Sequence, residues 1–179
     1  MTGLAFLFPP QMISGTCAKE KFLKIDLYME NKGSLKKILW LVSWYPNRKD
    51  MTDGDFIQRQ ARAVALHLPV HVIYITKSAS AVRGLFETSV KQEGNLTEQI
   101  VYYRAPGKGN GLLQKIISQI RYRRTYKKVL TEWVAQHGVP RLVHVHVAAK
   151  AGMIALWMKQ KWGTGYILTE HWTGYYPAS

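Results

Sequence analysis

The sequence is poor in cysteine and in long apolar runs, and each shortage excludes a class of protein. One cysteine among 179 residues excludes an internal disulfide framework and fits a reducing compartment. No run approaches the roughly 18 consecutive apolar residues of a membrane-spanning helix. Aromatic and β-branched residues are plentiful, which excludes intrinsic disorder for most of the chain. We therefore expect a folded, cytoplasmic protein.

Acidic residues are also scarce. The 11 aspartates and glutamates are outnumbered by 25 lysines and arginines, which gives a formal net charge of +14. The excess is concentrated toward the C-terminus, since the segment from Leu112 onward holds ten basic and two acidic residues. A field of this sign attracts nucleic acid, anionic lipid or small molecules that carry phosphate. Composition does not choose among these three partners.

Short apolar runs typical of buried strands alternate with helical patterns from Lys37 onward. The strand patterns cover residues 38–43, 70–76, 142–147 and 166–171. The helical patterns cover residues 57–68, a long stretch that ends near Gly138, and residues 150–162. Two alternating stretches around residues 93–95 predict a β-hairpin. This order predicts an α/β fold, a Rossmann-like, mostly parallel sheet with helices on both faces and an edge β-hairpin.

The pattern divides the chain into two parts. Residues 1–36 show no sustained period and include a turn or linker pattern, so we expect a poorly ordered lead-in there. Residues 37–179 are expected to form one Rossmann-like domain.

In open parallel sheets, ligands bind at the carboxyl ends of the strands. The predicted strands end in aromatic, lysine, glutamate and histidine residues, and this mixture suits a sugar or another polyol. The residues in question are Trp44, Tyr45, Lys77, Lys150, Glu170, His171 and Trp172. His171 taken alone is slightly more typical of a structural residue than of a catalytic one. Its position at the mouth of the predicted pocket nevertheless sets it above the other five histidines.

Asp53, Gly54 and Asp55 lead into the first predicted helix. The free N–H groups and the dipole of that helix could hold a phosphate, and Gly54 would allow a close approach of the backbone. From these residues alone, an ordinary N-cap formed by Asp53 or Asp55 is favoured over phosphate binding.

His144 and His146 lie two residues apart on one face of a predicted strand, where both could ligate a metal. No cysteine pair or carboxylate lies at the usual spacing, so we favour buried, hydrogen-bonded imidazoles and predict no metal site. Only His146, nearer the carboxyl end of the strand, is placed to contact a ligand.

Residues 121–128, RYRRTYKK, form a strongly basic stretch within the long predicted helix. The simplest interpretation is a solvated helix face, and the sharper one is a surface for anionic membrane. Each cation near anionic lipid contributes about 1 kcal/mol. No nucleic-acid-binding module accompanies the charge, so we expect no nucleic acid partner. The cations are Arg121, Arg123, Arg124, Lys127 and Lys128.

Residues 38–65, ILWLVSWYPNRKDMTDGDFIQRQARAVA, combine a strand, a "WYP" loop, and a glycine before a helix that carries phenylalanine and glutamine. Residues 140–172, PRLVHVHVAAKAGMIALWMKQKWGTGYILTEHW, combine an "HxH" strand, an "AG" helix and a "TEHW" strand. In their order and spacing these segments resemble the N-terminal domain of family-4 (group 1) glycosyltransferases, which have the GT-B fold. The resemblance covers Lys37–Trp172.

The resemblance implies two Rossmann-like domains that face each other across a cleft. The N-terminal domain chiefly binds the acceptor, and the C-terminal domain binds most of the nucleotide-sugar donor. We therefore expect this chain to be an N-terminal domain, truncated before the donor-binding domain and inactive alone. The full enzyme would transfer a sugar, with retention of configuration, to a glycan or lipid-linked acceptor in cell-surface polysaccharide synthesis.

On the donor side, the resemblance implies that Gly54, together with Asp53, approaches the donor diphosphate. Many members of the family carry two glycines there, whereas this chain has Asp53 before Gly54. His171 matches the histidine that lies beside the reacting sugar, where it positions or stabilises. The family needs no bound metal, and the nucleotide-sugar is a substrate, so we expect no cofactor.

On the acceptor side, Trp44, Tyr45 and Trp172 fall where the resemblance implies acceptor contacts, and we expect His146 to join them. A basic domain also suits a peripheral position at the inner face of the cell membrane. The alternative from another class is a non-catalytic, basic Rossmann-like domain that binds anionic membrane or nucleic acid.

Overall fold

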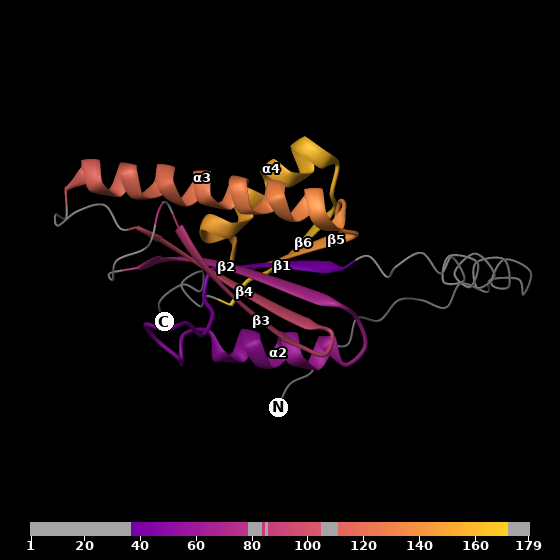
Figure 1. Ribbon diagram of the computed structural model, residues 1–179. Coiled ribbons are helices and arrows are strands. Elements are labelled where there is room, and N and C mark those ends of the chain that lie inside the picture. The colour runs from indigo at the N-terminus through magenta and orange to yellow at the C-terminus, as the bar shows by residue number, and fades with distance from the viewer. Residues whose placement is uncertain (1–36, 79–83, 85, 105–110, 172–179) are drawn as a thin grey trace, which may run out of the picture. The chain divides into compact units, whose positions relative to one another are not determined.

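A six-stranded sheet forms the centre of the computed structural model, which describes residues 37–78, 84, 86–104 and 111–171 (Figure 1). The predicted lead-in and Trp172 lie outside the described residues. The strands are β1 (Ile38–Val42), β2 (Val70–Ser78), β3 (Phe86–Glu93), β4 (Leu96–Arg104), β5 (Leu142–His146) and β6 (Tyr166–Thr169). Their order across the sheet is β3-β4-β2-β1-β5-β6, and every pairing is parallel except that of β3 with β4.

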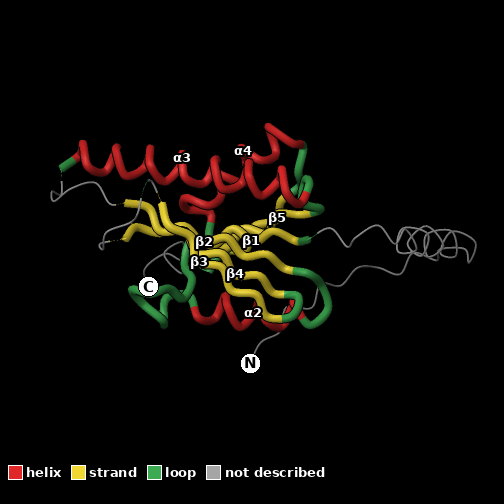
Figure 2. Tube along the Cα trace, viewed as in Figure 1, coloured by secondary structure: helices red, strands yellow, loops and turns green. Residues whose placement is uncertain are grey.

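Helices cover both faces of this sheet. The helical segments are α2 (Asp55–Ala65), α3 (Leu112–His137), α4 (Met153–Trp162) and a short kinked turn, η1 (Ala148–Gly152). Figures 1 and 2 show α2 on one face and α3 with α4 on the other. The predicted α/β class, with its mostly parallel sheet and edge hairpin, is confirmed.

The alternation of side chains along β1 explains why its sequence is apolar throughout. Leu39 and Leu41 pack into the core beneath α3 and α4, whereas Trp40 and Val42 pack into the core beneath α2. A strand covered by helices on both faces has no position for a solvated side chain. β5 carries an alternation of the same kind, and its Val143 and Val145 belong to the α3 side.

The start of α2 differs from the prediction. Neither Asp53 nor Asp55 caps the helix, because Gly54 is the N-cap residue, in the left-handed conformation at φ 63°, and no side chain caps the first turn. Asp53 instead accepts a hydrogen bond from the Tyr74 hydroxyl at 3.2 Å, and Asp55 pairs with Arg59 at 3.3 Å. The helix also ends at Ala65, before the end of the predicted apolar stripe.

The hairpin of β3 and β4 closes one edge of the sheet. Glu93 pairs with Leu96 across the turn, and Gly94 has the positive φ of 55° that a tight hairpin turn requires. β3 is largely exposed and carries Lys91 and Glu93, charges that discourage pairing with another chain.

The five parallel strands place their carboxyl ends along a single edge, which we call the carboxyl edge. The last strand, β6, ends at Thr169, so Glu170 and His171 lie just beyond it and not within the strand as predicted.

Within the described ranges, no helix is long and apolar enough to cross a membrane.

Candidate functional site

A polar pocket of about 380 Å³ opens at the carboxyl edge, on the side of the sheet that α3 covers. Its described lining contains four lysines and no acidic residue. The lysines are Lys49, Lys77, Lys115 and Lys150. They come from the loop after β1, the end of β2, the first turn of α3 and the turn after β5, so the fold brings them together from four separate elements. We call this cavity the lysine pocket.

Six further residues of the lining carry hydroxyl groups, Ser43, Tyr74, Thr76, Tyr103, Ser118 and Tyr122. The Tyr74 hydroxyl donates to Asp53, and the hydroxyls of Tyr103 and Ser118 bond with each other. Burial raises the pKa of the Tyr74 phenol to about 12 and also raises the pKa values of Tyr103 and Tyr122. These phenols stay neutral near pH 7, and a neutral hydroxyl can both donate and accept a hydrogen bond. Cations together with neutral hydroxyls suit a ligand that carries both phosphate and sugar hydroxyls.

A pair of histidines lies at the same edge, toward the α2 side of the sheet. The Nδ1 atom of His146 lies 3.0 Å from the Nε2 atom of His171, and the two rings are stacked. His146 is fully buried against the Trp40 ring, with a centroid distance of 4.3 Å. Its Nε2 atom has no hydrogen-bond partner within the part of the chain that the structure describes. The edge therefore holds a buried imidazole with one ring nitrogen unused.

Burial keeps the inner imidazole of this pair uncharged. The pKa of His146 falls to about 3, first because burial penalises the charged ring and then because His144 and His171 would repel it. The pKa of His144 is lowered for the same first reason, and its Nε2 atom bonds with the Thr169 hydroxyl at 2.8 Å. Neutral imidazoles hydrogen-bond in one direction per nitrogen, so His146 fixes the orientation of the His171 ring.

Glu170 and Ser43 hold the backbone turn between these two features. The Glu170 carboxylate accepts the backbone N–H groups of Ala148 at 3.0 Å and of His171 at 3.1 Å. The Ser43 hydroxyl donates to the carbonyl of Ala149 at 2.7 Å. These bonds tie the ends of β1, β5 and β6 together at one point of the edge.

The turn that they hold is strained. Val147 has φ 73° and Lys150 has φ 67°, and these are the only described residues other than glycine with a positive φ. Such conformations cost about 1–3 kcal/mol each and cluster at functional sites. The strain at Val147 lies directly after His146, and the strain at Lys150 places a lysine on the wall of the pocket.

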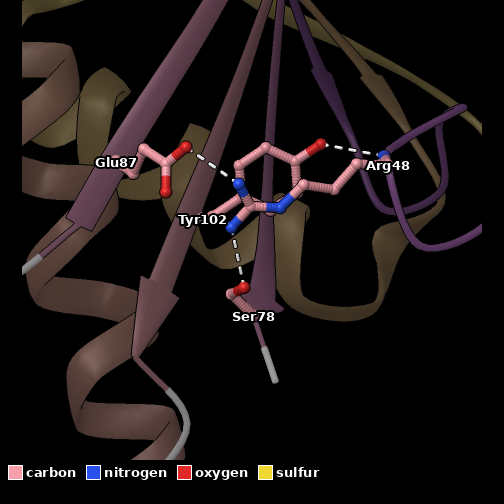
Figure 3. A network of polar contacts seen from close by, with 4 residues as sticks. All are labelled: Arg48, Ser78, Glu87 and Tyr102. Carbon is pink, nitrogen blue, oxygen red and sulfur yellow. Dashed lines mark hydrogen bonds and ion pairs between the residues drawn. The ribbon is translucent and has the colours of Figure 1, made fainter. Parts of the chain in front are cut away.

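Arg48 anchors the loop after β1 across the ends of the neighbouring strands (Figure 3). Its guanidinium donates to Glu87 on β3 and to the hydroxyl of Ser78 on β2, each at 2.8 Å. The same group lies 3.9 Å above the ring of Tyr102 on β4, whose hydroxyl accepts the backbone N–H of Arg48 at 3.0 Å. The loop that carries Lys49 is thereby fixed to three strands.

The structure places the predicted donor-side residues close together. His171 packs edge-on against Phe56, in the first turn of α2, with a centroid distance of 4.9 Å. Gly54 lies two residues earlier and makes close contact with the backbone of Trp44 and Tyr45, which a Cβ atom would approach to 2.6 Å. Its conformation and its missing side chain are therefore explained by packing within the loop.

Two of the predicted acceptor residues lie in the interior. The Tyr45 side chain is fully buried, and its hydroxyl donates to Glu98 on β4 at 2.6 Å. Tyr45 therefore anchors the loop after β1 to the sheet and has no exposed surface for an acceptor. His146 is buried as well and contacts His171, whereas Trp44 is half-buried at the edge. The predicted Trp172 lies outside the described residues.

The sequence interpretation missed Lys49, Lys115 and the Arg48 network. Lys49 lies in the loop after β1 and Lys115 in the first turn of α3, and no local pattern marks either as a site residue.

Within the described ranges, no three histidine, cysteine or acidic side chains converge in a way that could hold a metal.

The basic stretch on α3 has its tyrosines and cations on different sides. Tyr122 and Tyr126 are buried in the core, and all five cations are exposed. The first turns of α3 also expose four large apolar side chains, Leu112, Leu113, Ile116 and Ile120.

No family model matches this chain, and no curated protein matches its sequence.

Proposed function

We propose that the described residues form the acceptor-side domain of a retaining glycosyltransferase of the GT-B type. The full enzyme would transfer a sugar from a nucleotide-sugar donor to a glycan or lipid-linked acceptor in cell-surface polysaccharide synthesis. The observation that carries the proposal is the lysine pocket, because a cluster of lysines and neutral hydroxyls at the carboxyl edge suits a phosphorylated sugar. The resemblance of residues 38–65 and 140–172 to family-4 enzymes supports it.

In this proposal His171 lies beside the reacting sugar and His146 is a positioning residue behind it. The support is the 3.0 Å bond between their ring nitrogens and the burial of His146. The start of α2 at Gly54 approaches the donor diphosphate, with its N–H groups and helix dipole directed at negative charge. The contact of His171 with Phe56, in the first turn of α2, supports the assignment of both roles to one end of that helix.

The proposal assigns most donor contacts to a second domain, so we do not expect residues 1–179 alone to transfer sugar. Ligand binding is therefore the direct test. The chain is titrated calorimetrically with a short-chain prenyl diphosphate sugar, with the same sugar lacking phosphate, and with an oligonucleotide of matched charge.

Saturable binding of the diphosphate sugar, with weak binding of the other two ligands, is the result that we expect. Preferred binding of the oligonucleotide would favour the non-catalytic nucleic-acid module and overturn the proposal. Sugar transfer from a nucleotide-sugar by the chain alone would contradict the division of labour between two domains.

We further propose that α3 holds the domain on an anionic membrane surface. Four exposed apolar side chains in its first turns lie next to the five cations of residues 121–128, a combination typical of helices that lie in a membrane interface. Cosedimentation with vesicles should increase with the fraction of phosphatidylglycerol and decrease with salt. Equal binding to neutral vesicles would contradict this placement.

A further inference from the structure

The basic stretch of α3 is not a uniform surface, because some of its cations line a cavity and others do not. A cavity of about 410 Å³ lies between α3 and the hairpin strands, where β3 begins and β4 ends. Four cations line it, Arg104, Arg121, Arg124 and Lys128. Arg123 and Lys127 belong to the same helix but do not line it. We propose that this cavity, which we call the arginine pocket, binds the phosphoryl group of a phosphate ester.

The charge of the arginine pocket favours an anion. Its described lining contains no carboxylate. Among the ion pairs of the described residues, Lys128 makes a long contact of 4.0 Å with the exposed Glu132, and none involves Arg104, Arg121 or Arg124. Cations gathered without counter-charges repel one another, and an anion among them relieves that repulsion.

The placement of the guanidinium groups suits phosphate in particular. Arg121, Arg124 and Lys128 are spaced three and four residues apart, so they share one face of α3. The Arg121 guanidinium donates to the backbone carbonyl of Arg104 at 3.1 Å, which fixes it at the strand end. Guanidinium groups bind phosphate oxygens with two parallel hydrogen bonds, and the pocket offers three such groups.

The size and the remaining wall of the pocket indicate an ester larger than phosphate alone. A volume of about 410 Å³ lies within the usual range for small-molecule sites. The half-buried ring of Phe86 supplies an apolar wall, with the Lys128 ammonium 5.3 Å from its centroid. Thr125, the residue after Arg124, also lines the pocket. The ligand is therefore a phosphate with an attached organic group, from a lipid headgroup or from a soluble phosphate ester.

This inference does not rest on the proposed glycosyltransferase function. The described lining of the arginine pocket shares no residue with the lysine pocket. It also differs from a diffuse membrane surface, because it assigns unequal roles to neighbouring arginines. Arg124 lines the pocket and Arg123, the next residue along the helix, does not.

Arg124→Gln and Arg123→Gln form a matched pair for the test, since both remove one exposed positive charge from the same turn of α3. The full chain is titrated with inorganic pyrophosphate and, separately, with phosphatidylcholine vesicles that contain phosphatidic acid. Loss of one charge-assisted contact predicts about tenfold weaker binding for Arg124→Gln. Arg123→Gln is expected to leave the affinity for pyrophosphate unchanged, and to weaken binding to the vesicles less than Arg124→Gln does.

A local measurement separates this pocket from the lysine pocket, which also attracts pyrophosphate. Phenylglyoxal modifies exposed arginines, and mass spectrometry reports the modification of each residue. Saturating pyrophosphate should protect Arg121 and Arg124 and leave Arg123 reactive, and vesicles should protect Arg121 and Arg124 more strongly than Arg123.

The two probes identify the source of the phosphoryl group. Protection by pyrophosphate indicates a soluble phosphate compound as the ligand, and protection by the vesicles alone indicates a lipid headgroup. Equal weakening by both variants, equal protection of all three arginines, or no binding of either probe would overturn the inference.

Discussion

At the scale of single residues, buried imidazoles couple the stability of this domain to pH. His71, near the opposite end of the sheet, accepts a hydrogen bond from the Trp133 indole at its Nδ1 atom, and its Nε2 atom bonds with Gln99. Burial lowers the pKa of His71 to about 4 and that of His146 to about 3, from an ordinary value of 6.5. Both rings are neutral in the folded state near pH 7.

We predict that the domain loses stability as the pH falls below about 6.5. The unfolded chain takes up a proton on each imidazole near pH 6.5, whereas the folded chain does so only near pH 4 and pH 3. The unfolded state therefore binds more protons in this window. At pH 5 each histidine lowers the free energy of unfolding by about 2 kcal/mol.

Urea unfolding at pH 7 and pH 5 measures this loss. His71→Gln should remove the part that comes from His71 and leave the parts that come from His146 and His144, whose pKa values are also lowered. His67→Gln, at an exposed position after α2, should leave it unchanged. An equal free energy of unfolding at both pH values in the unmodified chain would contradict the assignment of buried neutral rings.

Among the glycines that the structure describes, Gly54 is the one for which we predict the largest effect of adding one methyl group. Gly54→Ala would place a Cβ atom 2.6 Å from the Trp44 carbonyl carbon while keeping φ 63°. The positive φ alone costs about 1–2 kcal/mol for a residue with a Cβ, and the backbone contact adds to it.

Gly163→Ala is the matched control, because Gly163 has a similar φ of 70° and open space around a Cβ atom. The free energy of unfolding should therefore fall further for Gly54→Ala than for Gly163→Ala. Equal losses would show that the close approach to the loop after β1 has no energetic weight.

At the scale of the elements, the loop after β1 is held by contacts distant in sequence. Arg48→Gln removes the ion pair with Glu87 and the contact with the Tyr102 ring (Figure 3). Both charged groups are more than a third exposed, so we expect a loss of only about 1 kcal/mol in the free energy of unfolding. The larger effect should be faster hydrogen exchange in the loop that carries Lys49.

Arg59→Gln provides the comparison, since Arg59 forms an exposed pair with Asp55 within α2. It should leave exchange in the loop unchanged. Similar exchange in both variants would mean that Arg48 does not anchor the loop.

The strands and helices could be predicted from apolar periodicity. A strand such as β1 is buried on both faces, so its sequence is a continuous apolar run. The start of α2 could not be predicted from the sequence, because the conformation of Gly54 depends on contact with Trp44, ten residues earlier. The lysine pocket lies at the carboxyl edge, where the sequence predicted a ligand site. The burial of Tyr45 was missed, since its partner Glu98 lies on a distant strand.

At the scale of the whole domain, positive charge is arranged around two cavities on the α3 side of the sheet. The lysine pocket lies at the ends of β1 and β2, and the arginine pocket lies between α3 and the hairpin. Eight of the 25 lysines and arginines line these two cavities. We propose that the lysine pocket recognises a phosphorylated sugar and that the arginine pocket recognises a further phosphate ester.

We propose that the lysine pocket binds a phosphorylated sugar, and a comparison of three affinities tests this proposal. Calorimetric titration with a prenyl diphosphate sugar is performed on the unmodified chain, on Lys77→Gln and on Lys91→Gln. Lys77 lines the pocket, whereas Lys91 lies on the edge strand β3 in an exposed pair with Glu93, so both substitutions remove the same charge. We predict about tenfold weaker binding for Lys77→Gln and unchanged binding for Lys91→Gln. Equal affinities for all three proteins would contradict the claim.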